Sequence, residues 1–557
     1  MAHITGIEST PPSITSSTEN SSIVPDLTPL FTKGRYGPSH WIHFLRMSSQ
    51  VKTSIQQQDA HAYKSYRTAK NEMRTRTLQQ LDGVSVYRIL PSRHIADRLV
   101  QAYLHTFQSV FAILDIPIFR AQYDDIWKKP ELPRGTPVYL LLLVLFTGSA
   151  CLPPEARVPR IVTQSWFYVA VTWVRDVTED INFDEDWLRF HCLQLLARQV
   201  LGQKPDAVYP STASVVRGAL NRLRCGAGHA GEETESRLLA IVIELDIQEA
   251  MLRGRPPVIN DHDFQLYFHS QVEADKPPNT TAHSSLKSEF TELSFYGLLK
   301  KTLPLRLRIA RYVNDSSRER TFEETLRLSQ EFLAALDVCK GQVDSFRMSS
   351  RPPTTCQTSL FDLFNYGFLL SLHYEFAIQA HNNPAYYYSL AICRSTSLSL
   401  LAAMSAPENE DFRRLCLQGS RALCDVHRKS TLYLQGEIMR ESRVNSLFAR
   451  DPAALLTRRE MRRSVRGYLD FSRSRIAAGD MNVKFYLLLS TLMVFSDKQQ
   501  FDGRARQEVI SVWNSNLELC LRRLGAVRHE QKDHLASELH PPGIPKTLLD
   551  STGVGFL

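Results

Sequence analysis

A stretch in the middle of the chain, residues 236–264, is apolar around nearly the whole circumference of a helix. Its large aliphatic residues recur at helical spacing; they are Leu238, Leu239, Ile241, Val242, Ile243, Leu245, Ile247 and Leu252. A helix of this kind is stable only when neighbouring elements cover it on most sides. Gly254 offers a C-terminal stop, and Pro256 and Pro257 forbid continuation. The stretch therefore predicts a central helix inside a large helical body.

The rest of the chain repeats the helical spacing and contains no convincing strand pattern. Ser92 is the expected N-cap of a helix that Pro117 ends, and residues 118–127 begin another helix. Further helices are expected at 61–81, 138–151, 160–177, 187–202, 211–225, 290–313, 321–346, 359–381, 421–440, 452–477, 481–495 and 507–524. We therefore predict an all-α fold, a large multi-helix bundle-like domain.

Charge and cysteine content narrow the class of protein. The 557 residues include 66 Lys or Arg and 58 Asp or Glu, and the net charge of +8 is too mild to identify a nucleic-acid binder. The nine cysteines include no C-x-x-C pair and suit buried thiols in a reducing compartment. The apolar run 138–146 is far shorter than the ~20 residues of a membrane span, and no secretory signal precedes Lys33. We expect a soluble intracellular protein with no membrane partner.

The central stretch also carries a motif. Glu244-Leu245-Asp246 is followed by Gly254-Arg255-Pro256-Pro257, and then by Asp261 and Asp263. In this order and spacing the residues resemble the middle homology region of fungal zinc-cluster transcription factors. Two further islands resemble the same region: Leu90, Pro91, Ala96, Asp97, Leu99, Tyr103, Phe111, Ile113, Leu114, Pro117, Phe119, Tyr123 and Trp127, and then residues 368–376, 383–386 and 389–393. Residues 34–41 resemble a compressed form of the segment before that region, although a turn followed by an aromatic anchor explains them equally well.

The resemblance implies a fungal transcriptional regulator of a metabolic or secondary-metabolite gene set, located in the nucleus. Family members begin with six cysteines that hold two zinc ions, but no cysteine here precedes Cys151, so we expect no zinc-cluster DNA reader. The expected partners are a DNA-binding partner protein, with DNA reached indirectly, a small-molecule effector, and a second subunit in a homo- or heterodimer. We expect no enzyme activity and no cofactor, and nominate no catalytic, cofactor-binding or metal-binding residue. Arg255 is the polar residue of the motif that we expect to do more than support the fold.

On this interpretation the chain divides into five segments. Residues 1–33 are rich in Ser, Thr and Pro and are expected to be disordered, because they cannot bury enough apolar surface. Residues 34–82 form a linker with a basic helix, and residues 83–300 form the core of the middle homology region. Residues 301–530 form a C-terminal helical half packed on that core, and residues 531–557 form a tail.

An all-α enzyme or small-molecule binder, similar to a terpene cyclase, is the main alternative. Such enzymes hold magnesium and diphosphate with aspartates on facing helices. Asp124-Asp125 would begin one of the two motifs and Asn314-Asp315-Ser316 the other. Lys128 and Arg318 place a cation where each motif needs another ligand, which argues against this alternative.

Two further patterns have simpler explanations. Residues 226–231 fit G-x-G-x-x-G, but they follow a helix and not a strand, so a dinucleotide-binding loop is not favoured. Cys416, Cys424 and His427 are close in sequence but lack a fourth ligand, which favours buried thiols over a metal site.

Arginines are concentrated in the helix expected at residues 452–477. Arg459, Arg462, Arg463 and Arg466 share one face of that helix. They would suit contact with phosphates or an acidic partner, although a solvated face is the favoured interpretation.

Overall fold

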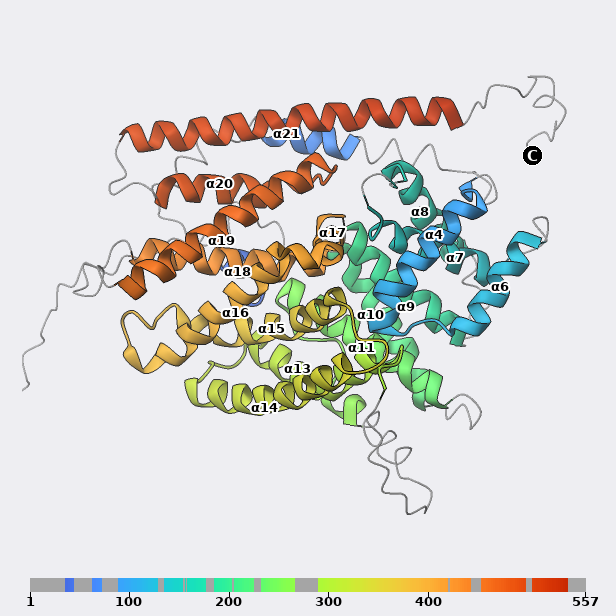
Figure 1. Cartoon of the computed structure of the whole chain (residues 1–557), viewed down its shortest axis with the longest axis horizontal. Coiled ribbons are helices and arrows are strands. Elements are labelled where there is room, and N and C mark those ends of the chain that lie inside the picture. Colours follow the sequence, from blue (N-terminus) through green and yellow to red (C-terminus); the bar gives the residue numbers. More distant parts are fainter. Residues whose placement is uncertain are drawn as a thin grey trace, which may run out of the picture.

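The computed structural model describes residues 36–44, 63–72, 89–128, 135–153, 156, 158–176, 185–202, 205–224, 232–265, 289–418, 421–441, 452–496 and 503–538. Within these ranges every regular element is a helix and none is a strand, so the predicted all-α fold is confirmed (Figure 1). The N-terminal segment 1–33 and the loop 226–231 lie outside the described residues, as does most of the predicted tail.

The N-terminal half of the body begins with short helices and continues with longer ones. Its elements are η1 (Trp41–Phe44), α4 (Arg93–Tyr103), the π-helical turn η2 (Leu104–Gln108), α5 (Ser109–Phe111), α6 (Ile116–Lys128), α7 (Thr136–Ser149), α8 (Arg160–Asp176), α9 (Glu185–Leu201), α10 (Pro205–Arg224) and α11 (Glu232–Arg253). Helices α4 to α10 lie at the right of Figure 1.

The C-terminal half is a stack of longer helices. Its elements are α13 (Ser294–Asn314), α14 (Phe322–Arg347), α15 (Thr355–Ala377), η5 (Pro384–Tyr386), α16 (Tyr387–Ser405), η6 (Pro407–Asn409), α17 (Glu410–Gln418), α18 (Arg421–Glu441), α19 (Pro452–Ala477), α20 (Lys484–Ser496) and α21 (Gly503–Glu538). In Figure 1, α14 lies at the lower edge of this stack and α21 at the upper edge, with α15, α16, α18, α19 and α20 between them. Among the described residues no single helix is long and apolar enough to cross a membrane. Two consecutive segments, Pro384–Ser405 and Pro407–Gln418, reach that length and apolar content only when they are taken together, and the chain bends by 74° between them.

The prediction that Pro117 ends a helix is wrong. The helical run from α4 ends at Phe111, because Ala112 takes a left-handed conformation with φ 51°. Pro117 is instead the second residue of α6. Proline is tolerated in the first turn of a helix, where its missing N–H would have had no intrahelical acceptor.

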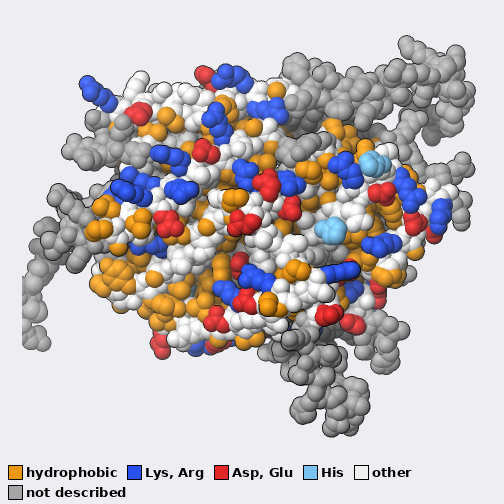
Figure 2. All heavy atoms as spheres, viewed as in Figure 1, with side chains coloured by type: hydrophobic (Ala, Val, Ile, Leu, Met, Phe, Trp, Pro, Cys, Tyr) orange, Lys and Arg blue, Asp and Glu red, His pale blue; other side chains and the backbone are white. Residues whose placement is uncertain are grey.

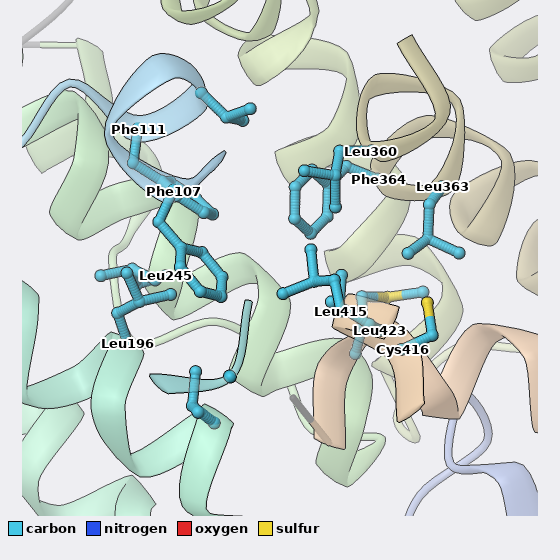
Figure 3. Packing of buried hydrophobic residues seen from close by; sticks show 14 of the residues in the cluster. Phe107, Phe111, Leu196, Leu245, Leu360, Leu363, Phe364, Leu415, Cys416 and Leu423 are labelled. Atoms are coloured by element: carbon cyan, nitrogen blue, oxygen red, sulfur yellow. The ribbon is translucent and has the colours of Figure 1, made fainter. Parts of the chain in front are cut away.

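The predicted central helix, α11, joins the two halves. It packs against α9 and α10 on one side and against α13 and α18 on the other. In Figure 3, Leu245 of α11 and Leu196 of α9 lie beside Phe107 and Phe111. The ring of Phe111 then meets that of Phe364 on α15 edge to face, with centroids 5.6 Å apart. One continuous apolar core therefore runs across both halves, as the encircling apolar pattern of α11 requires.

Candidate functional site

The acidic part of α11 lies inside the core and forms a polar network there. Glu244 accepts a hydrogen bond of 2.7 Å from Nη1 of Arg306 on α13, and the two side chains are 5% and 0% exposed. Arg306 also donates to the hydroxyl of Thr302 and to the carbonyl of Leu299, while Gln248 donates to Glu244. A buried charge pair is stable only with such additional hydrogen bonds. This network explains the carboxylate at position 244 as part of the fold.

The second carboxylate of the motif fixes the segment that follows α11. Asp246 accepts a hydrogen bond of 3.0 Å from the backbone N–H of Ile259. Burial raises the pKa of Asp246 to about 6, although the bonded N–H groups and the nearby Arg311 oppose that rise. Arg311 donates to the carbonyl of Ile259 and pairs with Asp261. The segment that follows Gly-Arg-Pro-Pro therefore folds back against α11 and is held there by Asp246. Arg255 lies exposed just beyond the end of α11, and its role stays a prediction.

Residues 36–44, which we call the N-terminal clasp, dock onto the C-terminal end of α11. The N–H of Gly37 donates to the carbonyl of Arg253, and the hydroxyl of Ser39 donates to the carbonyl of Met251. The N–H of Ser39 donates to the side chain of Asn314, at the end of α13. These contacts tie a segment near the start of the described chain to the motif of α11.

Aromatic rings complete the clasp. Trp41 meets Phe485 of α20 edge to face, and Phe44 stacks on Tyr374 of α15 with centroids 3.8 Å apart. The hydroxyl of Tyr374 donates to the carbonyl of His43. The turn-and-anchor interpretation of this segment therefore agrees with the structure, and the anchor reaches two helices of the C-terminal half, α15 and α20.

A buried histidine links three helices of the C-terminal half. The two ring nitrogens of His373 on α15 each lie 2.8 Å from a serine hydroxyl, Ser389 of α16 and Ser329 of α14. His373 is fully buried, and burial lowers its pKa to about 4. The site is closed to solvent, so the arrangement orients three helices and offers no route for a substrate.

Stability is expected to fall between about pH 7 and about pH 5 partly because of His373. The unfolded imidazole takes up a proton near its ordinary pKa of about 6.5, whereas the folded imidazole stays neutral until about pH 4. Between these values the unfolded chain binds more protons, so acidification favours unfolding. We expect His373→Gln to remove about 2 kcal/mol of this loss. Urea unfolding at about pH 7 and about pH 5 measures the loss, and His94→Gln, at an exposed position on α4, is the matched control. An unchanged pH dependence in His373→Gln would contradict the assignment.

The aspartates of the enzyme alternative are not brought together. On α6, Asp124 pairs with Arg93 at 2.6 Å and Asp125 with Lys128 at 3.8 Å, all four side chains being largely exposed. Asn314 is buried at the end of α13 and bonded to the clasp. Figure 1 places α6 and α13 in different parts of the body, so these groups do not face one another across a cleft.

The cysteine and histidine cluster is part of the core. The thiol of Cys424 donates to the carbonyl of Cys416, and the ring of His427 bonds the carbonyl of Leu423 and stacks on Tyr468. In the described part of the chain, no group of three or more His, Cys, Asp or Glu side chains is arranged to hold a metal ion.

The arginine-rich face of α19 borders an open groove of about 520 Å³ between α18, α19 and α20. We call it the arginine groove. Its polar lining is Arg459, Arg462, Arg463, Arg466, Asp470, Gln435 and Ser496, and its apolar lining includes Ile438, Val465 and Met493. Figure 2 shows basic side chains gathered at the left of the body, over α18 and α19, beside hydrophobic ones. The arginine spacing was visible in the sequence, but the walls from α18 and α20 were not.

Comparisons with known proteins agree with the fold and the motif. No family model matches the chain. It is 27% identical over 474 residues to transcription factor lepE of Aspergillus flavus, covering 80% of this chain and 56% of that protein. It is 23% identical to transcription factor asR3 of Sarocladium schorii, covering 75% and 54% of the two chains. It is 23% identical to the aspyridones cluster regulator apdR of Emericella nidulans, covering 57% and 46%.

The helical body with its buried Glu-Leu-Asp network agrees with the resemblance that the motif showed. The chain is thus similar to fungal transcription factors over 67–80% of its length in three such matches. It spans about half the length of the relatives it matches.

Proposed function

We propose that the protein regulates transcription of a secondary-metabolite gene set in a fungus, acting in the nucleus and not as an enzyme. The observation that carries the proposal is the similarity to transcription factor lepE across 80% of the chain. A relative named as the regulator of the aspyridones cluster supports a biosynthetic gene set as the target. We assign the helical body a regulatory and interaction role, with a DNA-binding partner protein, a second subunit and a small-molecule effector as its classes of ligand.

Deletion of the gene in its host tests this proposal. We expect transcripts of one contiguous set of biosynthetic genes to change by about tenfold or more, with recovery when the wild-type gene is restored. A fluorescent fusion of the chain should accumulate in the nucleus. A transcriptome that does not change under conditions in which the gene is expressed would refute the regulatory role.

A further inference from the structure

The exposed face of α19 extends beyond the arginine groove toward the start of the helix. Leu455 and Leu456 lie there, 40% and 67% exposed. Leu455, Arg459, Arg462 and Arg466 follow one another at steps of four, three and four residues, so they share one face of the helix. The opposite face, with Met461 and Tyr468, packs into the body. The surface therefore combines two exposed leucines with four arginines over on the order of 20 Å.

Among the described residues, none of Arg459, Arg462, Arg463 and Arg466 has an ion-pair partner, although Asp470 lines the same groove. Like charges three and four residues apart repel one another along a helix. A ligand with carboxylates would relieve that repulsion, because guanidinium groups pair with carboxylates through two parallel hydrogen bonds.

The leucines and the acidic residues of the face distinguish between ligands. A phosphate backbone gains nothing from exposed Leu455 and Leu456, and Asp470 in the groove and the exposed Glu460 would repel it. An amphipathic peptide would contact both parts of the face. Its apolar residues would cover the two leucines and the apolar lining at Ile438 and Met493, and its carboxylates would pair with the arginines.

We propose that the arginine groove and the adjoining leucines bind an acidic, leucine-bearing peptide segment of a partner protein. This proposal names the kind of partner that the protein would bind in the regulatory role proposed above, and its biological meaning rests on that role. Binding is measured with purified protein, so a negative result here and a failure of the transcriptional proposal are distinguishable.

The test uses the full chain and a fluorescently labelled synthetic peptide of about 16 residues, with leucines at helical spacing and glutamates between them. Fluorescence anisotropy gives its affinity for the wild type, for Arg459→Glu/Arg463→Glu and for Leu455→Ser/Leu456→Ser. The control variant is Arg98→Glu/Arg120→Glu, which reverses two exposed charges on α4 and α6, away from α19. The changed residues are all exposed, and circular dichroism confirms that each variant keeps its helices.

We expect saturable binding that weakens at least about tenfold in the arginine variant, falls in the leucine variant, and changes less than about twofold in the control. Replacing the leucines of the peptide by serine should also weaken binding. The proposal is overturned if the peptide does not bind, if the control variant weakens binding as much as the arginine variant, or if the serine peptide binds equally well. Preferential binding of a labelled DNA duplex, lost in the arginine variant, would overturn it in favour of nucleic acid.

Discussion

Replacement of Arg306 by methionine is expected to lower the free energy of unfolding by about 3–5 kcal/mol, because it leaves Glu244 charged and without its cation inside the core. Glu244 is 5% exposed, and Arg306 is its ion-pair partner from α13. Urea unfolding followed by helical circular dichroism measures the loss. Since Glu244 lies on α11, the helix on which both halves pack, the loss should appear in the unfolding of the whole body.

Two control variants show whether the buried charge is the cause. Arg308 pairs with Glu331 at 2.6 Å, but these side chains are 41% and 37% exposed, so Arg308→Met should cost less than about 1 kcal/mol. The double variant Glu244→Leu/Arg306→Met removes both charges and should recover more than half of the loss, because well-packed apolar residues replace a buried pair with little penalty. An Arg306→Met variant as stable as the wild type would contradict the network described here.

Substitution of Gly254 by alanine is expected to destabilise the protein by about 3 kcal/mol and to release the clasp. Gly254 ends α11 with φ +69°, in the left-handed region, and a Cβ there would overlap the carbonyl group of Gly37. Gly37→Ala should have a similar effect, since its Cβ would overlap the carbonyl of Gly254. Thermal unfolding measures the stability, and limited proteolysis followed by mass spectrometry detects release of residues 36–44.

The variant Gly479→Ala is the control that separates the cost of the close approach at Gly254 from the cost of the left-handed backbone conformation. Gly479 has φ +93°, and a Cβ built on it meets nothing within 4 Å. Gly479→Ala should therefore cost only the left-handed conformation, about 1 kcal/mol. If Gly254→Ala costs no more than Gly479→Ala, the packing of the clasp against α11 does not contribute to stability as inferred.

Several features of the candidate sites could be predicted from local pattern. The bounds of α19 were predicted correctly as 452–477, and the four arginines were placed on one face, because spacing along a single helix is enough to decide both. The motif residues Glu244 and Asp246 were recognised by order and spacing. Their buried partners were not, because Arg306 lies 62 residues beyond Glu244.

Other elements escaped sequence reasoning for physical reasons. α17 is short and amphipathic, and its sequence gave no strong apolar run. α21 extends to Glu538, well beyond the predicted 524, through a polar sequence without a helix stop. The break at Ala112 has no glycine or proline at the residue that turns. The division into segments at residues 82, 300 and 530 stays a proposal.

By itself the sequence determined the fold class, the central position of α11 and the resemblance to fungal transcription factors, because apolar periodicity and an ordered motif are local properties of the chain. Only the tertiary structure decided that Ser39 meets Asn314, 275 residues away, that Arg306 neutralises Glu244, and that α18 and α20 wall the arginine groove. Such contacts depend on how helices pack, and the packing is set by the whole apolar core, so no single stretch of sequence specifies them.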